Sequence, residues 1–193
     1  METITSLAAA ADYFCFPKLH KKVTDFVLLR MDKNKQLALG FFITASNSGS
    51  APDIVRAAME TIQNHFEDCQ LQDSKDFLGH LSPGSLEKIV SNEAAVADEV
   101  DLLKLVASWV DCNSDSHGDE SAGNAMFATR EKRKEVASEL VEKHICLGKI
   151  APSHLHEVIE PSGIVSAERL LKTYKAHSLC IEESKMDPPH KKT

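Results

Sequence analysis

The sequence predicts an all-α fold of about eight helices, arranged as stacked antiparallel helical hairpins. Apolar residues recur at the three- and four-residue spacing of amphipathic helices, and no segment shows sustained alternation of apolar and polar residues. Turn residues separate the periodic segments at helix-length intervals. Because the links between these segments are short, neighbouring helices are expected to pack against one another as hairpins.

Four helices are predicted in the first part of the chain. The segment "ITSLAAAADYFCF" is rich in alanine, and Pro17 ends it and begins a second helix, because proline is favoured in the first turn of a helix. A third segment, "KQLALGFFITASNSG", ends at Gly49, and the fourth helix begins near Pro52. One face of this fourth helix is predicted to carry Ile54, Ala58, Ile62, His65 and Phe66.

The remaining helices follow in the same manner. Two short helices, around Phe77 and Leu86, precede a helix from about Glu99 to Val110. A long helix near 129–145, a short one begun by Pro152 and a last one begun at Ser166 complete the order. The end of the chain, 179–193, is charged and contains prolines, so it is predicted to be a disordered tail.

The helix near 99–110 contains Trp109, the only tryptophan of the chain. At about 100° per residue, its apolar side chains gather on one face and its polar side chains on the other. The apolar face carries Leu102, Leu103, Val106, Trp109 and Val110, and the polar face carries Asp101, Lys104, Ser108 and Asp111. Trp109 is therefore predicted to anchor this helix in the core.

Composition and charge exclude several classes of protein. The formal net charge of −7 argues against broad binding of nucleic acid or of anionic membranes, since phosphate contacts need a basic surface. The basic stretch "REKRKE", 130–135, is interspersed with acids and is predicted to be a solvated helix face. The five cysteines are spread along the chain without a C-x-x-C pair, which favours reduced thiols and a cytoplasmic or nuclear location. No apolar run approaches the roughly 20 residues of a membrane helix.

The loop after Trp109 imitates two ligand-binding motifs. Asp111, Asn113 and Asp115 have the spacing that begins a calcium loop, but the positions that need glycine and a bidentate glutamate hold Ser116 and Ala122. The glycines of a phosphate-binding loop are imitated by Gly118 and Gly123, without the lysine that must follow them. We therefore expect a solvated loop here, with no metal and no cofactor.

The histidines do not indicate a catalytic or metal site. His154 and His156 are two residues apart, so on a helix they point in nearly opposite directions and cannot bind one ion together. His65 and His144 fall on apolar helix faces and are predicted to be partly buried core residues. With no hydrolase or protease signature in the sequence, the chain is predicted not to be an enzyme.

Several segments of the sequence, in the same order along the chain, resemble helices of the BTB–BACK family. The segment "SLAAAADYFCFPKLHKKVTDFVL", 6–28, resembles the last two helices of a BTB domain, and 37–69 looks like the three-box helix pair that begins a BACK domain. "DFLGHLSPGSLEKIVSNE", 76–93, and "EVDLLKLVASWV" are similar to the BACK helices that follow, and 145–171 is similar to the close of BACK-type regions. The expected domains are truncated BTB-like helices, 1–31, a BACK-like domain, 32–178, and the tail. Neither a BTB core nor kelch repeats are recognised, so the chain is expected to be a truncated product or a fragment.

The resemblance implies an adaptor role in a cullin–RING ubiquitin ligase, with a cullin and a substrate protein as partners. In that family the three-box pair forms a groove for the N-terminal segment of the cullin, and the residues expected near it are Leu39, Phe42, Ile62 and Phe66. For each of the four, packing in the core is the favoured alternative, because an apolar residue on such a helix faces the stack by default. The alternative is a helical interaction module without a ligase link, such as a cytoskeletal or transcriptional scaffold. Dimerisation through a BTB core is not expected, although apolar surface on residues 6–30 could favour self-association.

Overall fold

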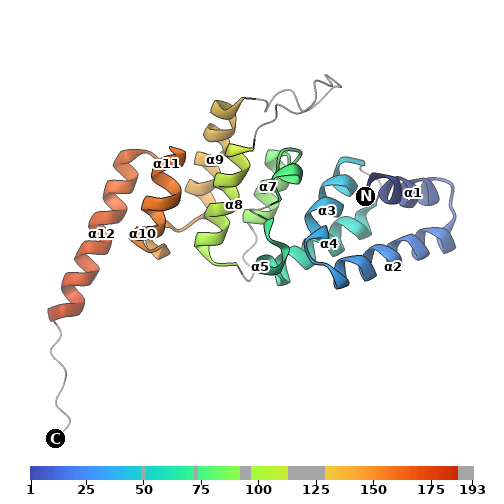
Figure 1. The fold of residues 1–193 in the computed structure, drawn as a ribbon, viewed down its shortest axis with the longest axis horizontal. Coiled ribbons are helices and arrows are strands. Elements are labelled where there is room, and N and C mark those ends of the chain that lie inside the picture. The colour runs from blue at the N-terminus through green and yellow to red at the C-terminus, as the bar shows by residue number, and fades with distance from the viewer. Residues whose placement is uncertain (49–50, 72–73, 92–96, 113–128, 187–193) are drawn as a thin grey trace, which may run out of the picture.

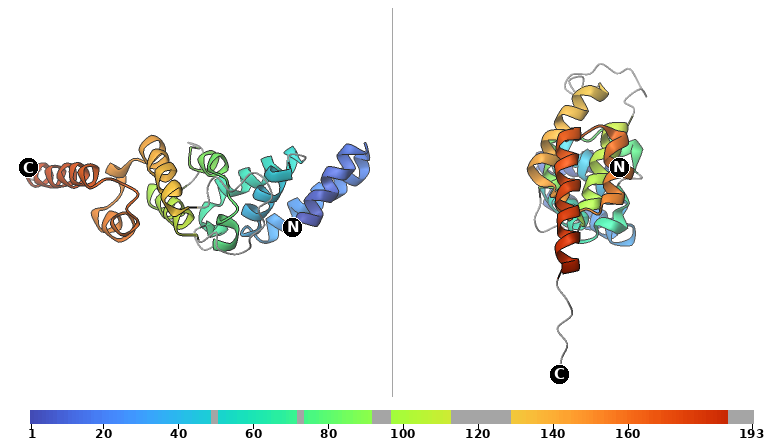
Figure 2. Two further views of the ribbon diagram at one scale, coloured as in Figure 1. Left: turned by 90° about the horizontal axis from the view of Figure 1, so that it is seen from above. Right: turned by 90° about the vertical axis from the view of Figure 1, so that its left-hand side faces the viewer.

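The computed structural model describes residues 1–193 except 49–50, 72–73, 92–96, 113–128 and 187–193. All regular structure in the described residues is helical, which confirms the predicted fold class. The helices follow one another along one long axis, with the first two helices at one end and α12 (Ala167–Met186) at the other (Figure 1). Figure 2 shows the same row of hairpins from above.

The first hairpin joins α1 (Glu2–Tyr13) to α2 (Pro17–Lys33), which begins at the predicted proline. The buried residues of α1 are small, since Thr5, Ala8 and Ala11 are at most 1% exposed. These small side chains let α1 lie close to the buried face of α2, which consists of Val23, Val27 and Met31.

The second hairpin is formed by α3 (Leu37–Ser48) and α4 (Pro52–Asn64). Helix α3 packs against both α1 and α4, and its buried residues, Ala38, Leu39, Phe41, Phe42, Ile43 and Ala45, cover most of its circumference. Gly40 permits this close packing, because a Cβ atom there would collide with the Met1 side chain and lie 3.1 Å from the ring of Phe77. A helix that is apolar nearly all round is expected at the centre of a stack.

Three short helices lead to the middle of the molecule: α5 (Phe66–Cys69), α6 (Lys75–Leu78) and α7 (Pro83–Val90). Helix α7 begins where the sequence places a serine before a proline. The Ser82 hydroxyl accepts a hydrogen bond from the backbone N–H of Ser85 at 3.2 Å and so caps the helix.

Helices α8 (Glu99–Asp111) and α9 (Arg130–His144) form the next hairpin and match the predicted bounds within a residue or two. A 3₁₀ turn η3 (Leu147–Lys149) leads to α10 (Pro152–His154), the π turn η4 (Leu155–Ile159) and α11 (Glu160–Ser162). Gly163 then adopts a left-handed conformation, with φ of 62°, and redirects the chain into α12.

The number of long helices and the end of α12 can be compared with the predictions. Among the described residues, eight helices are eight residues or longer (α1, α2, α3, α4, α7, α8, α9 and α12), in agreement with the predicted number. The predicted disordered tail was placed too early, because α12 continues to Met186; residues 187–193 lie outside the described part. Residues 179–186 contain no proline or glycine, so nothing in them ends the helix.

A single cluster of buried side chains extends from Ala8 in α1 to Leu170 in α12. Its largest member is Trp109, which is fully buried, as its helix face predicted. No helix in the described ranges has both the length and the apolar character needed to cross a membrane.

Candidate partner-binding site

The four residues predicted to line a partner groove are all buried in the core. Leu39 and Phe42 on α3, Ile62 on α4 and Phe66 at the start of α5 are between 0 and 2% exposed. Within the hairpin they belong to the hydrophobic cluster that holds α3 and α4 together. Of the four, only Phe42 also lines a surface pocket, so the predicted contact with a partner remains a prediction.

The pocket lies between α3 and α4 and has a volume of about 550 Å³. Such a volume is typical of a site for a small ligand or for one or two side chains of a bound peptide. Most of its lining is apolar: Phe42 and Ala45 from α3, then Ala51, Pro52, Val55 and Met59 from the start of α4 and the residue before it. Among these apolar residues Pro52 is exposed and Val55 and Met59 are half-buried, so these three present surface in the pocket.

Two cations lie at the rim of this pocket. Arg56 is already paired with Asp53, at 2.6 Å from Nη2 to Oδ1, and its side chain is 70% exposed. Lys88 comes from α7 and is exposed; no ion pair of its ammonium group is found in the described part of the chain. The rim therefore favours a partner segment with an apolar side chain beside a negative charge or a backbone carbonyl.

Trp109 and Arg133 hold the segment before α7 against α8. Trp109 Nε1 donates to the backbone carbonyl of Leu81 at 2.9 Å. Arg133 is 4% exposed and donates to the carbonyls of Trp109, Cys112 and Gly79 at 3.0, 2.8 and 3.2 Å. These contacts fix the start of α7, the helix that brings Lys88 to the pocket.

The sequence predicted that the whole stretch 130–135 forms a solvated face, and for Arg133 this prediction is wrong. Its neighbours Arg130, Glu131 and Lys132 are exposed as predicted. Arg133 is buried because it precedes Ala137 and Leu140 by four and seven residues and shares their face. The prediction followed the charge of the stretch, whereas the spacing of Arg133 from Ala137 and Leu140 was the signal for its burial.

The two histidines predicted to be core residues differ. His144 is only 16% exposed and its Nε2 lies 3.3 Å from a carboxylate oxygen of Glu87, so this prediction is confirmed. His65 is 44% exposed, so that prediction is wrong. The reason is that α4 ends at Asn64, and His65 therefore leaves the apolar face that the helical spacing gave it.

Polar side chains join helices at two further places. Glu87 on α7 accepts from Lys143 Nζ at 2.6 Å and faces His144, and these hydrogen bonds lower the pKa of its carboxyl. Glu160 accepts from the Tyr174 hydroxyl at 2.9 Å and faces His156 Nδ1 at 2.8 Å, and both contacts lower the pKa of its carboxyl. Both clusters join elements of the fold, and neither lines the pocket.

The buried thiol of Cys69 and the search for metal ligands bear on chemistry in the described residues. Burial, and then the neighbouring Asp68 carboxylate, raises the pKa of the Cys69 thiol to about 11, which leaves it protonated and unreactive at neutral pH. No group of three or more histidine, cysteine or acidic side chains in the described ranges is arranged to hold a metal ion. The calcium-like and phosphate-like spacings extend into 113–128, outside the described residues.

The described fold is an all-α stack of helical hairpins with an apolar surface pocket between α3 and α4. Residues 38–122 match the family model BACK, described as BTB And C-terminal Kelch. This match spans α3 to α8, and it suggests an adaptor or scaffold module. No curated protein and no solved structure gives a significant match to the chain.

Proposed function

We propose that the chain is an adaptor scaffold of a cullin–RING ubiquitin ligase, and that the pocket between α3 and α4 receives the N-terminal segment of a cullin. The observation that carries the proposal is the position of the pocket. It lies on the hairpin at the start of the BACK match, which also resembles the three-box pair.

The lining of the pocket supports an extended or helical peptide as the ligand. Its floor is apolar, and the half-buried Val55 and Met59 offer area that a partner side chain can cover. Burying an apolar side chain there would contribute about 1.5–3 kcal/mol. Leu39, Ile62 and Phe66 support the pocket from beneath by holding α3 against α4.

The test is a pull-down with a cullin N-terminal domain that includes its N-terminal extension. Phe42 is a poor position for the variant, because it is 1% exposed and Phe42→Asp would bury an unpaired carboxylate and unfold the hairpin. Val55→Glu is better, since Val55 is half-buried and lines the pocket. Val136→Glu is the matched control: Val136 is equally half-buried, but lies on α9 away from the pocket.

We expect the wild-type chain and Val136→Glu to retain the cullin and Val55→Glu to lose it. Circular dichroism must show the same helix content for both variants. If the wild-type chain retains no cullin, the cullin role is wrong. If both variants retain it equally, the pocket is not the site.

A further inference from the structure

The charge of the pocket between α3 and α4 comes from a single side chain. The described lining contains two cations, Arg56 and Lys88, and no acid. Arg56 Nη2 lies 2.6 Å from Asp53 Oδ1, so the charge of Arg56 is largely compensated. Lys88 is exposed, and its ammonium group has no ion pair with any residue that the structure describes. The uncompensated positive charge at the pocket is therefore that of Lys88.

The acidic neighbour of Lys88 is engaged on another side of α7. Glu87 accepts a hydrogen bond from Lys143 Nζ at 2.6 Å and lies 3.3 Å from His144 Nε2, and both partners are on α9. Successive residues of a helix point about 100° apart, so Lys88 leaves α7 on a different side from Glu87. Helix α7 contacts both α4 and α9, and Figure 1 shows it between them. The contact with α9 thus keeps Glu87 from neutralising the cation at the pocket.

Helix α7 itself is held firmly, and only the side chain of Lys88 reaches into solvent. Trp109 Nε1 donates to the carbonyl of Leu81, two residues before the helix begins. Ile89 and Val90, which follow Lys88, are 1 and 3% exposed. A lysine ammonium is a compact charge on a flexible stem, so it can meet a ligand group at the rim of the pocket without a change in the fold.

We propose that Lys88 determines the specificity of the pocket, by selecting a protein segment in which a carboxylate adjoins the apolar side chain that fills the pocket. The inference rests on the proposed function, in that the pocket binds a segment of a protein partner, but it does not require that partner to be a cullin. The apolar side chain would cover Val55 and Met59, and the aspartate or glutamate beside it would accept a hydrogen bond from Lys88 Nζ. A carboxylate is preferred to a carboxamide because hydrogen bonds between charged groups are stronger, and a cationic side chain would be repelled.

A protein segment fits the pocket better than a small amphiphile such as a fatty acid, which also joins an apolar chain to a carboxylate. Pro52 and Arg56 are exposed and Val55 and Met59 are half-buried, so the pocket opens to the surface. Sites for small molecules enclose most of the ligand surface. The match to the BACK model also suggests protein–protein interaction in general.

The first experiment lets the pocket choose its ligand. Short random peptides displayed on phage are selected against the whole chain, and peptides that also bind Val55→Glu, in which the pocket is blocked, are discarded. We expect the remaining peptides to carry aspartate or glutamate within a residue or two of a large apolar residue. The same selection on Lys88→Glu should instead enrich lysine or arginine at that place.

The second experiment measures the contact itself, with one selected peptide and two versions that have glutamine or lysine in place of its acid. Affinities for the whole chain are measured by fluorescence anisotropy. The glutamine version should bind the wild-type chain about threefold to tenfold more weakly than the acidic peptide. Lys88→Glu should lose this preference and bind the lysine version better than the wild-type chain does. A purely structural role of Lys88 would not produce such an exchange of charges.

The matched control is Lys132→Glu. Lys132 is exposed on α9 and lies outside the pocket, so this variant makes the same change of charge elsewhere on the chain and should keep the preference of the wild type. Lys88 is also exposed, so both variants should keep their helix content in circular dichroism.

Three outcomes would overturn the proposal. The first is that the selection yields no peptide that depends on the pocket, or that such peptides share no acid. The second is that Lys88→Glu prefers the acidic peptide as strongly as the wild-type chain does. The third is that decanoate binds the pocket more tightly than the selected peptide and displaces it. The cullin role is tested separately: a wild-type chain that retains no cullin but prefers the acidic peptide contradicts the cullin role alone.

Discussion

At the scale of single residues, Arg133 is the side chain that joins the most elements through hydrogen bonds. The carbonyls of Trp109 and Cys112 lie at the C-terminal end of α8, where helical carbonyls lack partners, and Arg133 donates to both. Its third bond reaches Gly79, before α7, and its guanidinium carbon lies 5.3 Å from the centroid of the Trp109 ring. Burial lowers the pKa of Arg133, but arginine remains protonated in proteins.

Replacing Arg133 should therefore be costly. Arg133→Met keeps the apolar stem and removes the donors of the hydrogen bonds to the carbonyls of Trp109, Cys112 and Gly79. We expect the free energy of unfolding to fall by about 2–4 kcal/mol, measured by urea unfolding followed by circular dichroism. Arg130→Met is the control, since Arg130 forms a half-exposed pair with Asp111 at 2.7 Å and should cost less than about 1 kcal/mol. Equal losses in the two variants would contradict the assigned role.

The contrast between Trp109 and Arg133 shows what sequence patterns convey at this scale. Trp109 was predicted correctly, because its size and its place on an apolar face both favour burial. Arg133 has the spacing of a buried residue, but a buried arginine needs acceptors, and its acceptors are carbonyls up to 54 residues away. Nothing in the local sequence reveals that three carbonyls meet at that point.

At the scale of elements, helical spacing predicted the bounds of most helices. The predictions were least accurate for residues at the ends of helices. His65 was placed on the face of α4 although the helix ends one residue earlier. For the candidate site, the four residues predicted from the sequence lie on or beside the hairpin that carries the pocket, and all four are buried. The half-buried Val55 and Met59 line the pocket, and which half-buried residues remain uncovered depends on neighbours such as α7.

The contact between α7 and α9 should depend on pH through Glu87. Hydrogen bonds, first from Lys143 and then from His144, lower the pKa of Glu87 below its usual 4.5 in the folded chain. Glu87 therefore adds stability above the pKa that it has in the unfolded chain, and this contribution is lost as pH falls through its lower folded pKa. Because Glu87 is exposed to solvent at the surface, we expect a modest effect.

The measurement is the melting temperature from pH 7 to pH 3. Glu87→Gln should lower it at pH 6, and the difference from the wild type should shrink as pH falls, because the wild-type carboxylate becomes protonated. Glu142→Gln, on α9 and exposed, has no ion pair in the described part of the chain and should follow the wild type at every pH. A constant difference between Glu87→Gln and wild type from pH 6 to pH 3 would contradict the role of the ionised group.

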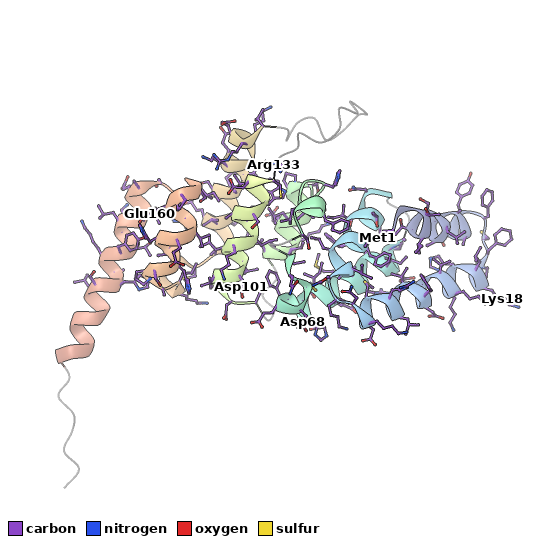
Figure 3. All side chains as sticks on the ribbon, viewed as in Figure 1. Met1, Lys18, Asp68, Asp101, Arg133 and Glu160 are labelled. Atoms are coloured by element: carbon purple, nitrogen blue, oxygen red, sulfur yellow. The ribbon has the colours of Figure 1, made fainter. Side chains whose placement is uncertain are left out.

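At the scale of the whole molecule, the elongated stack makes each hairpin depend on its immediate neighbours. Helices α3 and α8 have neighbours on several sides, and each contains several fully buried side chains, Leu39 and Phe42 in α3 and Leu103 and Trp109 in α8. The labelled side chains in Figure 3 mark this axis, from Lys18 at one end to Glu160 near the other. The ends of the stack have fewer contacts, so they should contribute less to stability.

Helix α12 allows a direct measurement of this gradient, because its contacts with the stack are near its start. Leu170 is 8% exposed, and the Tyr174 hydroxyl reaches Glu160, whereas Leu179 is 60% exposed. A chain shortened after Ser178 should melt within about 2 °C of the full chain, and a chain shortened after Val165 should melt about 4 °C lower or more. The second chain loses the burial of Leu170, which contributes about 1.5–3 kcal/mol, and exposes the side chains that Leu170 covers. If removal of residues 179–193 alone lowered the melting temperature as much, the stack would depend on α12 beyond Ser178, contrary to the exposure of Leu179.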